Sequence, residues 1–498
     1  MPPESHDKRE IAAERLGRLN LEEFSALRVL VAGDFMLDEY LWGKVERISP
    51  EAPVAVVEVE RETHTLGGAG NVVNNLVALG AQVEVLGLVG EDNPGRLLKQ
   101  EMIRLGVEVN GLFTDRERRT SRKTRVIGAS QQVVRIDRET RTPAPSAFEQ
   151  AAQGFLEARL PEFNALVLSD YAKGVLTSPI LQKLIAQGRR QGSPVVVDPK
   201  GADYSVYAGA TVITPNRKEA ERAIGASLDS WEDLGRAGAR LRDRLSLDYL
   251  LITLGAEGML LISRGAPDTH IPTRAREVFD VSGAGDTVAA LMALGLAGWG
   301  DPVLAATLAN IAAGVVVGKV GTAPIFRTEL ARELGRDGTR LEEKIRPASE
   351  LRLLLSQLQA QGKTVVFTNG CFDLLHGGHI KFLEASRRLG DLLVVAVDSD
   401  ASVRAVKGEG RPVIGEEQRL RILAALESVD FVTLFTSEGL AELLATLKPD
   451  VLTKGSNYPE EQVAGREVVA GYGGRVALVP ITEPTSVSDL IQRIRQGE

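Results

Sequence analysis

Short apolar segments alternate with amphipathic segments over the first half of the chain. Amphipathic segments with the apolar spacing of α-helices lie at residues 94–105, 178–191 and 234–245. Between them, segments typical of buried β-strands lie at residues 28–33, 83–89, 165–169, 194–197, 211–214 and 249–254. Strands that alternate with helices predict a parallel α/β sheet with helices on both faces.

Two segments depart from this alternation. Residues 53–60 and 122–137 have the composition of β-ribbon, and no helix follows them closely. A separate β-structure that covers one edge of the main sheet would account for both. We therefore expect a β lid on the first domain.

The sequence predicts a division of the chain about two thirds of the way along it. Residues 327–350 are dense in mixed charge and contain Gly335, Gly338 and Pro347, which is typical of a linker. A strand is then expected at 364–368, a helix at 379–389 and a strand at 392–397. The predicted organisation is a first domain over residues 1–326, a linker over 327–350 and a smaller α/β domain over 351–498.

Composition narrows the class of protein. The 498 residues include 44% hydrophobic residues, carry a formal net charge of −8 and contain one cysteine, Cys371, which cannot form an internal disulfide. No long run of lysine and arginine indicates a nucleic-acid partner. Residues 1–18 lack the apolar core of a signal peptide, and no segment reaches the ~18 apolar residues of a membrane span. We expect a cytoplasmic protein.

Residues 279–287, with the sequence FDVSGAGDT, precede an apolar helical pattern. The small residues Gly283, Ala284 and Gly285 let the backbone approach a phosphate, and a helix that begins there directs free N–H groups at it. Asp286 is then placed to take a proton from an attacking hydroxyl. In isolation the same segment fits a capped helix equally well, because aspartate is favoured at helix starts.

Three further segments add to this candidate site. Residues 67–71 open a predicted helix and could hold a sugar, residues 214–219 place polar side chains one helical turn apart beside phosphates and Mg²⁺, and residues 253–258 form a glycine-rich turn suited to a nucleotide. The candidate residues are Gly67, Gly68, Asn71, Asn216, Glu219, Thr253, Gly255 and Gly258.

With these motifs, residues 25–325 resemble the ribokinase/PfkB family of carbohydrate kinases. The resemblance implies that Asp286 is the catalytic base, that Gly283, Ala284 and Gly285 form an anion hole, and that Asn216 and Glu219 position Mg²⁺ through water without ligating it directly. It also suggests residues that bind sugar hydroxyls, although a helix cap or a solvated turn is the alternative for each: Asp34, Asp38, Asp170 and Lys173.

In the second domain, residues 368–379 read TNGCFDLLHGGH after a predicted strand. His376 and His379 are three apart at a helix start, so their side chains share one face. A metal site would need a third ligand, and none is evident nearby. We expect Cys371 to be a small packing residue near the site, not a nucleophile.

This segment resembles the HxGH nucleotidyltransferases. The resemblance implies that His376 and His379 stabilise charge on a triphosphate, and that Asp373 holds the acceptor or positions a histidine. Asn457 and residues 485–488 depart from the common forms of that superfamily's later motifs. The remaining candidates for phosphate binding are Thr368, Asn369, Gly370, Lys407, Arg411 and Lys454, with Arg419 as a further cation.

The order of the two domains, together with residues 47–54 (RISPEAPV), resembles the bifunctional heptose 7-phosphate kinase/heptose 1-phosphate adenylyltransferase family over residues 27–495. The resemblance implies phosphorylation of D-glycero-β-D-manno-heptose 7-phosphate at O1 and transfer of AMP to heptose 1-phosphate. ATP is then the co-substrate of both reactions, with Mg²⁺. A separate phosphatase must act between them, and a homodimer is expected.

Two alternatives remain open from the residues. One is another sugar kinase joined to a glycerol-phosphate-type cytidylyltransferase. The other is a catalytically inactive sugar-binding protein, although the presence of Asp286, His376 and His379 argues against it.

Overall fold

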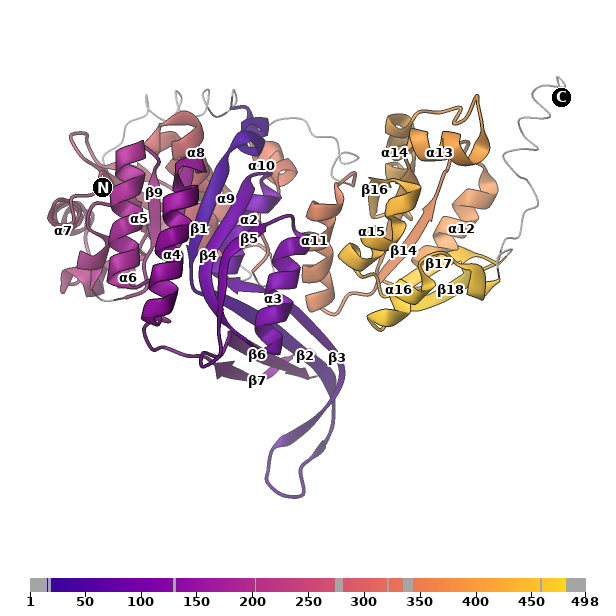
Figure 1. Ribbon diagram of the computed structural model, residues 1–498, viewed down its shortest axis with the longest axis horizontal. Coiled ribbons are helices and arrows are strands. Elements are labelled where there is room, and N and C mark those ends of the chain that lie inside the picture. The colour runs from indigo at the N-terminus through magenta and orange to yellow at the C-terminus, as the bar shows by residue number, and fades with distance from the viewer. Residues whose placement is uncertain are drawn as a thin grey trace. The chain divides into compact units, whose positions relative to one another are not determined.

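The computed structural model describes residues 16, 19–128, 131–201, 203–273, 281–319, 322–334, 344–456 and 459–480. The chain forms two compact units, Met1–Arg336 and Asp337–Glu498 (Figure 1). Each is an α/β unit with its own sheet, as the sequence pattern predicts.

The first unit contains a nine-stranded sheet in the order β13-β12-β11-β10-β9-β8-β1-β4-β5. Neighbours from β11 to β5 pair in parallel, whereas β12 and β13 are antiparallel. Most strands are continuous apolar runs because helices cover both faces. The strands are β1 (Arg28–Gly33), β4 (Gln82–Gly90), β5 (Glu108–Asp115), β8 (Ala165–Ser169), β9 (Val195–Asp198), β10 (Val212–Ile213), β11 (Tyr249–Thr253), β12 (Met259–Ser263) and β13 (Thr269–Ile271).

Helices cover this sheet on both faces. On one face, α4 (Ser146–Arg159), α5 (Ser178–Gln191), α6 (Arg217–Ile224) and α7 (Trp231–Arg244) contribute to a single apolar core, and Figure 1 shows α4 beside α5. On the other face, α8 (Ala284–Trp299) contacts β8 and β9 and packs against α2 (Ala69–Ala78) and α9 (Pro302–Val316). The α3 helix (Asn93–Arg104) contacts β4 and β5. The three helices predicted from apolar spacing are thereby confirmed.

The predicted β lid is a four-stranded sheet in the order β3-β2-β6-β7. Its strands are β2 (Phe35–Ile48), β3 (Ala55–Gly68), β6 (Ser121–Gly128) and β7 (Gln131–Arg138). Figure 1 shows the hairpin of β2 and β3 extending away from the main sheet. Because β2 follows β1 after one residue, the lid begins directly at the carboxyl edge of the main sheet.

The second unit contains a five-stranded parallel sheet in the order β16-β15-β14-β17-β18. The strands are β14 (Val365–Gly370), β15 (Leu392–Asp398), β16 (Phe431–Phe435), β17 (Val451–Gly455) and β18 (Arg475–Val479). One face packs on α11 (Ala348–Ala360), α15 (Leu440–Leu447) and α16 (Arg466–Gly471). The other packs on α12 (Gly377–Arg387) and α14 (Glu416–Ala424), and α13 (Asp400–Lys407) follows β15.

The segment expected to be a linker is structured at both ends. Residues 327–333 form α10 (Arg327–Glu333), and Glu329 of this helix pairs with Lys319 of the first unit at 2.6 Å. In the second unit, the backbone N–H of Arg346 donates to the carbonyl of Val432 at 2.9 Å. The expectation of a linker over all of 327–350 was therefore too broad. The charged residues of this segment resemble a linker, although its two ends pack on the units to which they belong.

Several sequence expectations fall outside the described residues: residues 279–280, Asn457 and residues 485–488. Within the described ranges, none of the helices combines the length and apolar character that crossing a membrane requires.

Candidate active sites

A cavity of about 450 Å³ lies at the carboxyl ends of β9, β10 and β11 in the first unit. Ligands of open parallel sheets bind at this edge. The cavity brings together residues from three segments that sequence analysis singled out: Asn216, Glu219, Thr253, Gly255, Gly258, Gly283, Ala284, Gly285 and Asp286.

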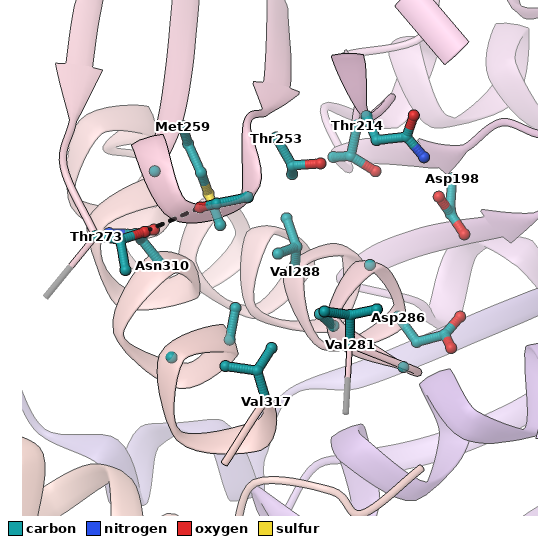
Figure 2. A pocket seen from close by; sticks show the side chains of 18 of the residues that line it. Asp198, Thr214, Thr253, Met259, Thr273, Val281, Asp286, Val288, Asn310 and Val317 are labelled. Atoms are coloured by element: carbon teal, nitrogen blue, oxygen red, sulfur yellow. Dashed lines mark hydrogen bonds between the residues drawn. The ribbon is translucent and has the colours of Figure 1, made fainter. Parts of the chain in front are cut away.

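The two ends of the cavity differ in polarity. Figure 2 shows the carboxylates of Asp198 and Asp286 toward one end, with Met259, Thr273 and Asn310 toward the other. At this second end Met259 offers apolar surface and Thr273 and Asn310 offer uncharged polar groups, a combination that suits a nucleobase. The cavity is thus polar where phosphates would lie and less polar where the base would lie.

Asp286 lies in the first turn of α8 and is 5% exposed. Its carboxylate accepts hydrogen bonds from the amide of Asn71 (2.8 Å) and from the hydroxyl of Tyr171 (3.0 Å). Burial raises the pKa of Asp286, while Asn71, the Lys200 ammonium and Tyr171 oppose the rise. A carboxylate with a raised pKa is suited to take a proton near neutral pH.

The backbone before Asp286 forms an anion site. Gly283 precedes α8 with φ of 81°, a left-handed conformation that favours glycine. A Cβ on Gly283 would also lie 2.6 Å from Nδ2 of Asn71. The free N–H groups and the positive dipole end of α8 therefore border the cavity beside Asp286.

A lysine that sequence analysis missed lies among the carboxylates at the polar end. The Lys200 ammonium is 3.4 Å from Asp198 and 3.2 Å from Glu219. Burial alone would lower the pKa of Lys200, but Asp198, Glu219 and Asp286 raise it. Burial raises the pKa of Asp198 to about 7, and Asp286 and Glu219 add to this effect against the charge of Lys200. Lys200 therefore remains a cation when the cavity is empty.

Asn216 and Glu219 are joined to one another at the start of α6. The side chain of Asn216 accepts from the N–H of Glu219 at 3.0 Å, and Glu219 accepts from the N–H of Asn216 at 2.9 Å. This is a capping box. Both residues line the cavity, so the cap also presents oxygen atoms to it.

Asp34 stabilises the loop after β8. Its carboxylate accepts from the backbone N–H groups of Tyr171 (2.9 Å), Lys173 (3.0 Å) and Val175 (3.3 Å). Burial raises the pKa of Asp34 to about 6 against these hydrogen bonds. The carboxylate of Asp34 thus positions the backbone of Tyr171, and its binding of sugar hydroxyls stays a prediction.

Other residues expected at the sugar are also engaged by protein groups. Asp38 pairs with Arg125 at 2.8 Å, and a Cβ on Gly67 would lie 2.5 Å from the Asp38 carboxylate. Asp170 accepts from the hydroxyl of Tyr207 at 2.6 Å. The Lys173 ammonium is 2.6 Å from Glu139. Gly68, with φ of 58°, precedes α2, and Asn71 contacts Asp286.

Tyr171, Asp198 and Lys200 are thus site residues that sequence analysis did not identify. Asp198 had one available signal, because it directly follows the apolar run 194–197 and strand ends meet at the ligand edge of a parallel sheet.

In the second unit, His376 precedes α12 and His379 lies in its first turn. Their ring centroids are 4.0 Å apart. Burial, His376 and Lys407 together lower the pKa of His379 to about 4, so it is neutral near pH 7. Within the described part of the chain, Nδ1 of each ring is buried without a hydrogen-bond partner. These two side chains are therefore placed to accept a ligand at a helix N-terminus.

Lys454 approaches the same region from β17. Its ammonium donates to the carbonyl of Asn369 at 2.8 Å, and burial lowers its pKa. Thr368 donates to the carbonyl of Thr453 at 3.1 Å and so joins β14 to β17. Gly370 ends β14, and Lys407 acts electrostatically on His379.

Asp373 and Arg411 bind each other instead of facing open solvent. Nε of Arg411 is 2.6 Å from Asp373, which also accepts from the N–H groups of Val413 (2.7 Å) and Ile414 (3.2 Å). Burial would raise the pKa of Asp373, but these hydrogen bonds lower it. The pair therefore fixes the loop before α14. Arg419 is likewise buried and donates to the carbonyl of Cys371 at 2.6 Å.

Comparison with known proteins agrees with the division of the chain into two units. Residues 26–329 match the pfkB family of carbohydrate kinases, and residues 367–492 match the cytidylyltransferase-like family. Bifunctional protein HldE of Desulfatibacillum aliphaticivorans is 50% identical over 484 residues, which cover 97% of this chain and 99% of that protein. Bifunctional protein HldE of Pelobacter propionicus is 52% identical over 93% of this chain and 95% of its own length.

The chain belongs to the HldE family of bifunctional proteins. It is a transferase that combines a carbohydrate kinase with a nucleotidyltransferase, and both activities imply the use of a nucleoside triphosphate, ATP.

Solved structures confirm the fold of the kinase half of this HldE relative. Phosphofructokinase-2 from Escherichia coli has a TM-score of 0.53 at 19% identity, covering 62% of this chain and 98% of that one. Arabidopsis thaliana ribokinase, complexed with ribose and ATP, has a TM-score of 0.50 at 19% identity, with 62% and 98% covered. The prediction of a ribokinase-like domain with a β lid, followed by a nucleotidyltransferase domain, is thereby confirmed.

Proposed function

We propose that this chain catalyses two steps of ADP-heptose synthesis, a route to lipopolysaccharide core. The first unit phosphorylates D-glycero-β-D-manno-heptose 7-phosphate at O1 with ATP and gives the 1,7-bisphosphate. The second unit transfers AMP from ATP to heptose 1-phosphate and releases pyrophosphate. Membership of the HldE family over nearly the whole chain supports both assignments.

The observation that carries the kinase assignment is the setting of Asp286. Its carboxylate lies at the polar end of the cavity beside the N-terminus of α8, with Asn71 and Tyr171 fixing its orientation. Asp286 takes the proton of the sugar O1 hydroxyl as O1 attacks the γ-phosphorus of ATP. The phosphoryl group then moves to O1, and ADP leaves.

Charge on the transferred phosphoryl group is stabilised by the backbone N–H groups of Gly283, Ala284 and Gly285 and by the Lys200 ammonium. Such positioned donors supply most of the catalysis in phosphoryl transfer. The carboxylates of Asp198 and Glu219 offer the oxygen ligands that Mg²⁺ prefers, and one oxygen of Asp198 is buried without a hydrogen-bond partner among the described residues. Bound there with ATP, directly or through water, Mg²⁺ would neutralise phosphate charge.

In the second unit, His376, His379 and the N-terminus of α12 bind the triphosphate. An oxygen of heptose 1-phosphate attacks the α-phosphorus of ATP, and pyrophosphate leaves. The two histidines and Lys454 stabilise the charge that develops, so the reaction needs no covalent intermediate on the protein.

The test is mass spectrometry of the products formed from heptose 7-phosphate and ATP. With the enzyme alone we expect the 1,7-bisphosphate, and with an added 7-phosphate-specific phosphatase we expect ADP-heptose. CTP in place of ATP serves as the control for a cytidylyltransferase. The proposal fails if no bisphosphate forms, or if the nucleotide sugar forms only with CTP.

Three further expectations follow. The second reaction consumes a monophosphate, so a separate phosphatase must remove the 7-phosphate between the two steps. The use of ATP and of phosphorylated sugars favours a cytoplasmic enzyme. Exposed apolar side chains on the lid favour a homodimer: Val45, Ile48, Val54, Val59, Val133, Val134 and Ile136.

A further inference from the structure

Lys123 lies on the face of the lid that carries Asp38. Strands β2 and β6 run in parallel, and Lys123 is the register partner of Asp38. Directly paired residues of neighbouring strands direct their side chains to the same face. Burial raises the pKa of Asp286, and the charge of Asp38 adds to the rise, so Asp38 lies near the base. Lys123 therefore belongs to the lid face beside the catalytic carboxylate.

The two carboxylates closest to Lys123 in the sheet are occupied by arginines. Asp38 is 2.8 Å from Arg125. Asp137, opposite Lys123 on β7, accepts from Arg135 through both of its oxygens at 2.9 and 3.0 Å. Over the ranges that the structure describes, Lys123 has neither a hydrogen bond nor an ion pair. It is unusual for a lysine that is partly buried, as Lys123 is, to have no carboxylate paired with its ammonium.

Tyr171 separates Lys123 from the nucleotide side of the site. The Lys123 ammonium is 5.8 Å from the centroid of the Tyr171 ring, and the Lys200 ammonium is 5.6 Å from it. The hydroxyl of the same ring donates to Asp286 at 3.0 Å. Lys200 is paired with carboxylates of the nucleotide cavity, whereas Lys123 belongs to the lid. One aromatic side chain is therefore flanked by two cations that serve different parts of the site.

We propose that Lys123 binds the phosphate group that the sugar acceptor already carries, and so selects a phosphorylated sugar over the free sugar. The inference rests on the proposed kinase function, in which the reacting hydroxyl lies at Asp286 and the 7-phosphate lies at the far end of the sugar. Lys123 and Asp286 both contact the side chain of Tyr171, Lys123 through the ring and Asp286 through the hydroxyl. An ammonium is a compact charge that binds phosphate from several directions.

The test compares two acceptors at saturating ATP: heptose 7-phosphate and the same heptose without phosphate. For Lys123→Met, kcat/KM for heptose 7-phosphate should fall about 10- to 100-fold, the usual effect of losing a charged hydrogen bond. The value for the free heptose and the KM for ATP should stay unchanged. Lys123→Arg should restore part of the loss. Lys183→Met is the matched control. Lys183 on α5 pairs with Glu157 on α4, and neither residue lines the nucleotide cavity.

The outcomes separate this inference from the proposed function. Equal losses for both acceptors would overturn the inference, because Lys123 would then only support Tyr171 or the lid. A wild-type enzyme that does not prefer heptose 7-phosphate to free heptose would contradict the proposed substrate itself. If Lys123→Met does not fold, as judged by circular dichroism and thermal unfolding, two other measurements replace it. These are the kinetics of Lys123→Gln and the competition of inorganic phosphate with the acceptor in the wild type. Phosphate that fails to compete would also overturn the inference.

Discussion

Asp286 combines two opposing influences on one carboxylate. Burial disfavours its charged form, and hydrogen bonds from Asn71 and Tyr171 favour it. Burial is the larger influence and raises the pKa, which makes the carboxylate a stronger base, while the hydrogen bonds limit the rise. Removing one donor shifts this balance in a direction that can be measured.

Tyr171→Phe removes a hydroxyl that donates to Asp286. Because that hydrogen bond lowers the pKa of Asp286, its loss should raise the pKa. The base then becomes active only at higher pH, so the acid limb of the kinase kcat/KM profile should move upward. A pH profile of the variant and the wild type checks this.

Tyr207→Phe is the matched control, since the hydroxyl of Tyr207 donates to Asp170 and not to Asp286. It should lower thermal stability slightly and leave the acid limb in place. Equal shifts in both variants would argue against a direct effect on the base.

Lys200→Met should lower the kinase kcat by about 10²–10³-fold, the usual effect of losing one donor to a transition state. The KM for ATP should change much less, because Lys200 is held by Asp198 and Glu219 before the nucleotide binds. Steady-state kinetics with ATP as the varied substrate measure both. A rise in KM at constant kcat would assign Lys200 to ground-state binding only.

His379 should gain basicity when ATP binds. Its pKa of about 4 reflects burial and nearby positive charge, and a triphosphate beside the ring would favour the charged form. The affinity of the second unit for ATP should therefore increase as the pH falls toward the pKa that His379 has in the ATP complex. Titration of the ring ¹⁵N signals by NMR, with and without ATP, tests this. An unchanged pKa would place the triphosphate elsewhere.

Sequence analysis found Asp286, Asn216 and Glu219 because each stands in a local motif. Tyr171 and Lys200 could not be found in that way, since their roles depend on which strands become neighbours. Tyr171 reaches Asp286 across 115 positions of sequence. The ion pair between Asp373 and Arg411 could not be predicted either, because the two residues are 38 positions apart and their motifs carry no sign of the contact.

At the scale of elements, the apolar pattern predicted the lid and the inner strands of the main sheet, but it missed several others. The predicted strands are β1, β4, β8, β9, β10, β11, β14 and β15, and the missed ones include β5, β12, β13, β16 and β18. It did not predict the length of the lid strands: β2 runs over Phe35–Ile48, where alternating charged residues mask the strand. It also missed α10, whose charged outer face resembles a linker. Surface elements carry little apolar signal, so their bounds depend on contacts that are distant in sequence.

The lid offers a test of self-association. Val134 on β7 is 48% exposed, and every residue of this edge strand is exposed. If the lid forms the dimer interface, Val134→Glu should convert a dimer to a monomer in analytical ultracentrifugation, because it places a charge in an apolar contact. Ile103→Glu on α3, at a position 54% exposed, is the control and should not change the mass. A monomeric wild type would contradict the proposal.

At the scale of the whole molecule, each unit has its own sheet, its own apolar core and its own candidate site. The proposed chemistry also requires an external phosphatase between the two reactions. Direct transfer of product from one site to the other would therefore not connect the two steps.

Single-site variants should consequently separate the two activities. Asp286→Asn should abolish kinase turnover and leave adenylyl transfer within twofold of wild type, whereas His379→Ala should do the converse. Separate assays of each variant with heptose 7-phosphate and with heptose 1-phosphate measure this. Loss of both activities in either variant would show that the two units depend on each other.

The position of Tyr171 also bears on the design of inhibitors. Burial raises the pKa of its hydroxyl well above the ordinary value, so the ring stays neutral and keeps its proton at any physiological pH. A compound that joins a nucleotide mimic to a sugar-phosphate mimic would meet this ring between its two halves. The linker between the two halves must therefore bend around the Tyr171 ring. A compound with a straight linker should bind no better than its nucleotide half alone.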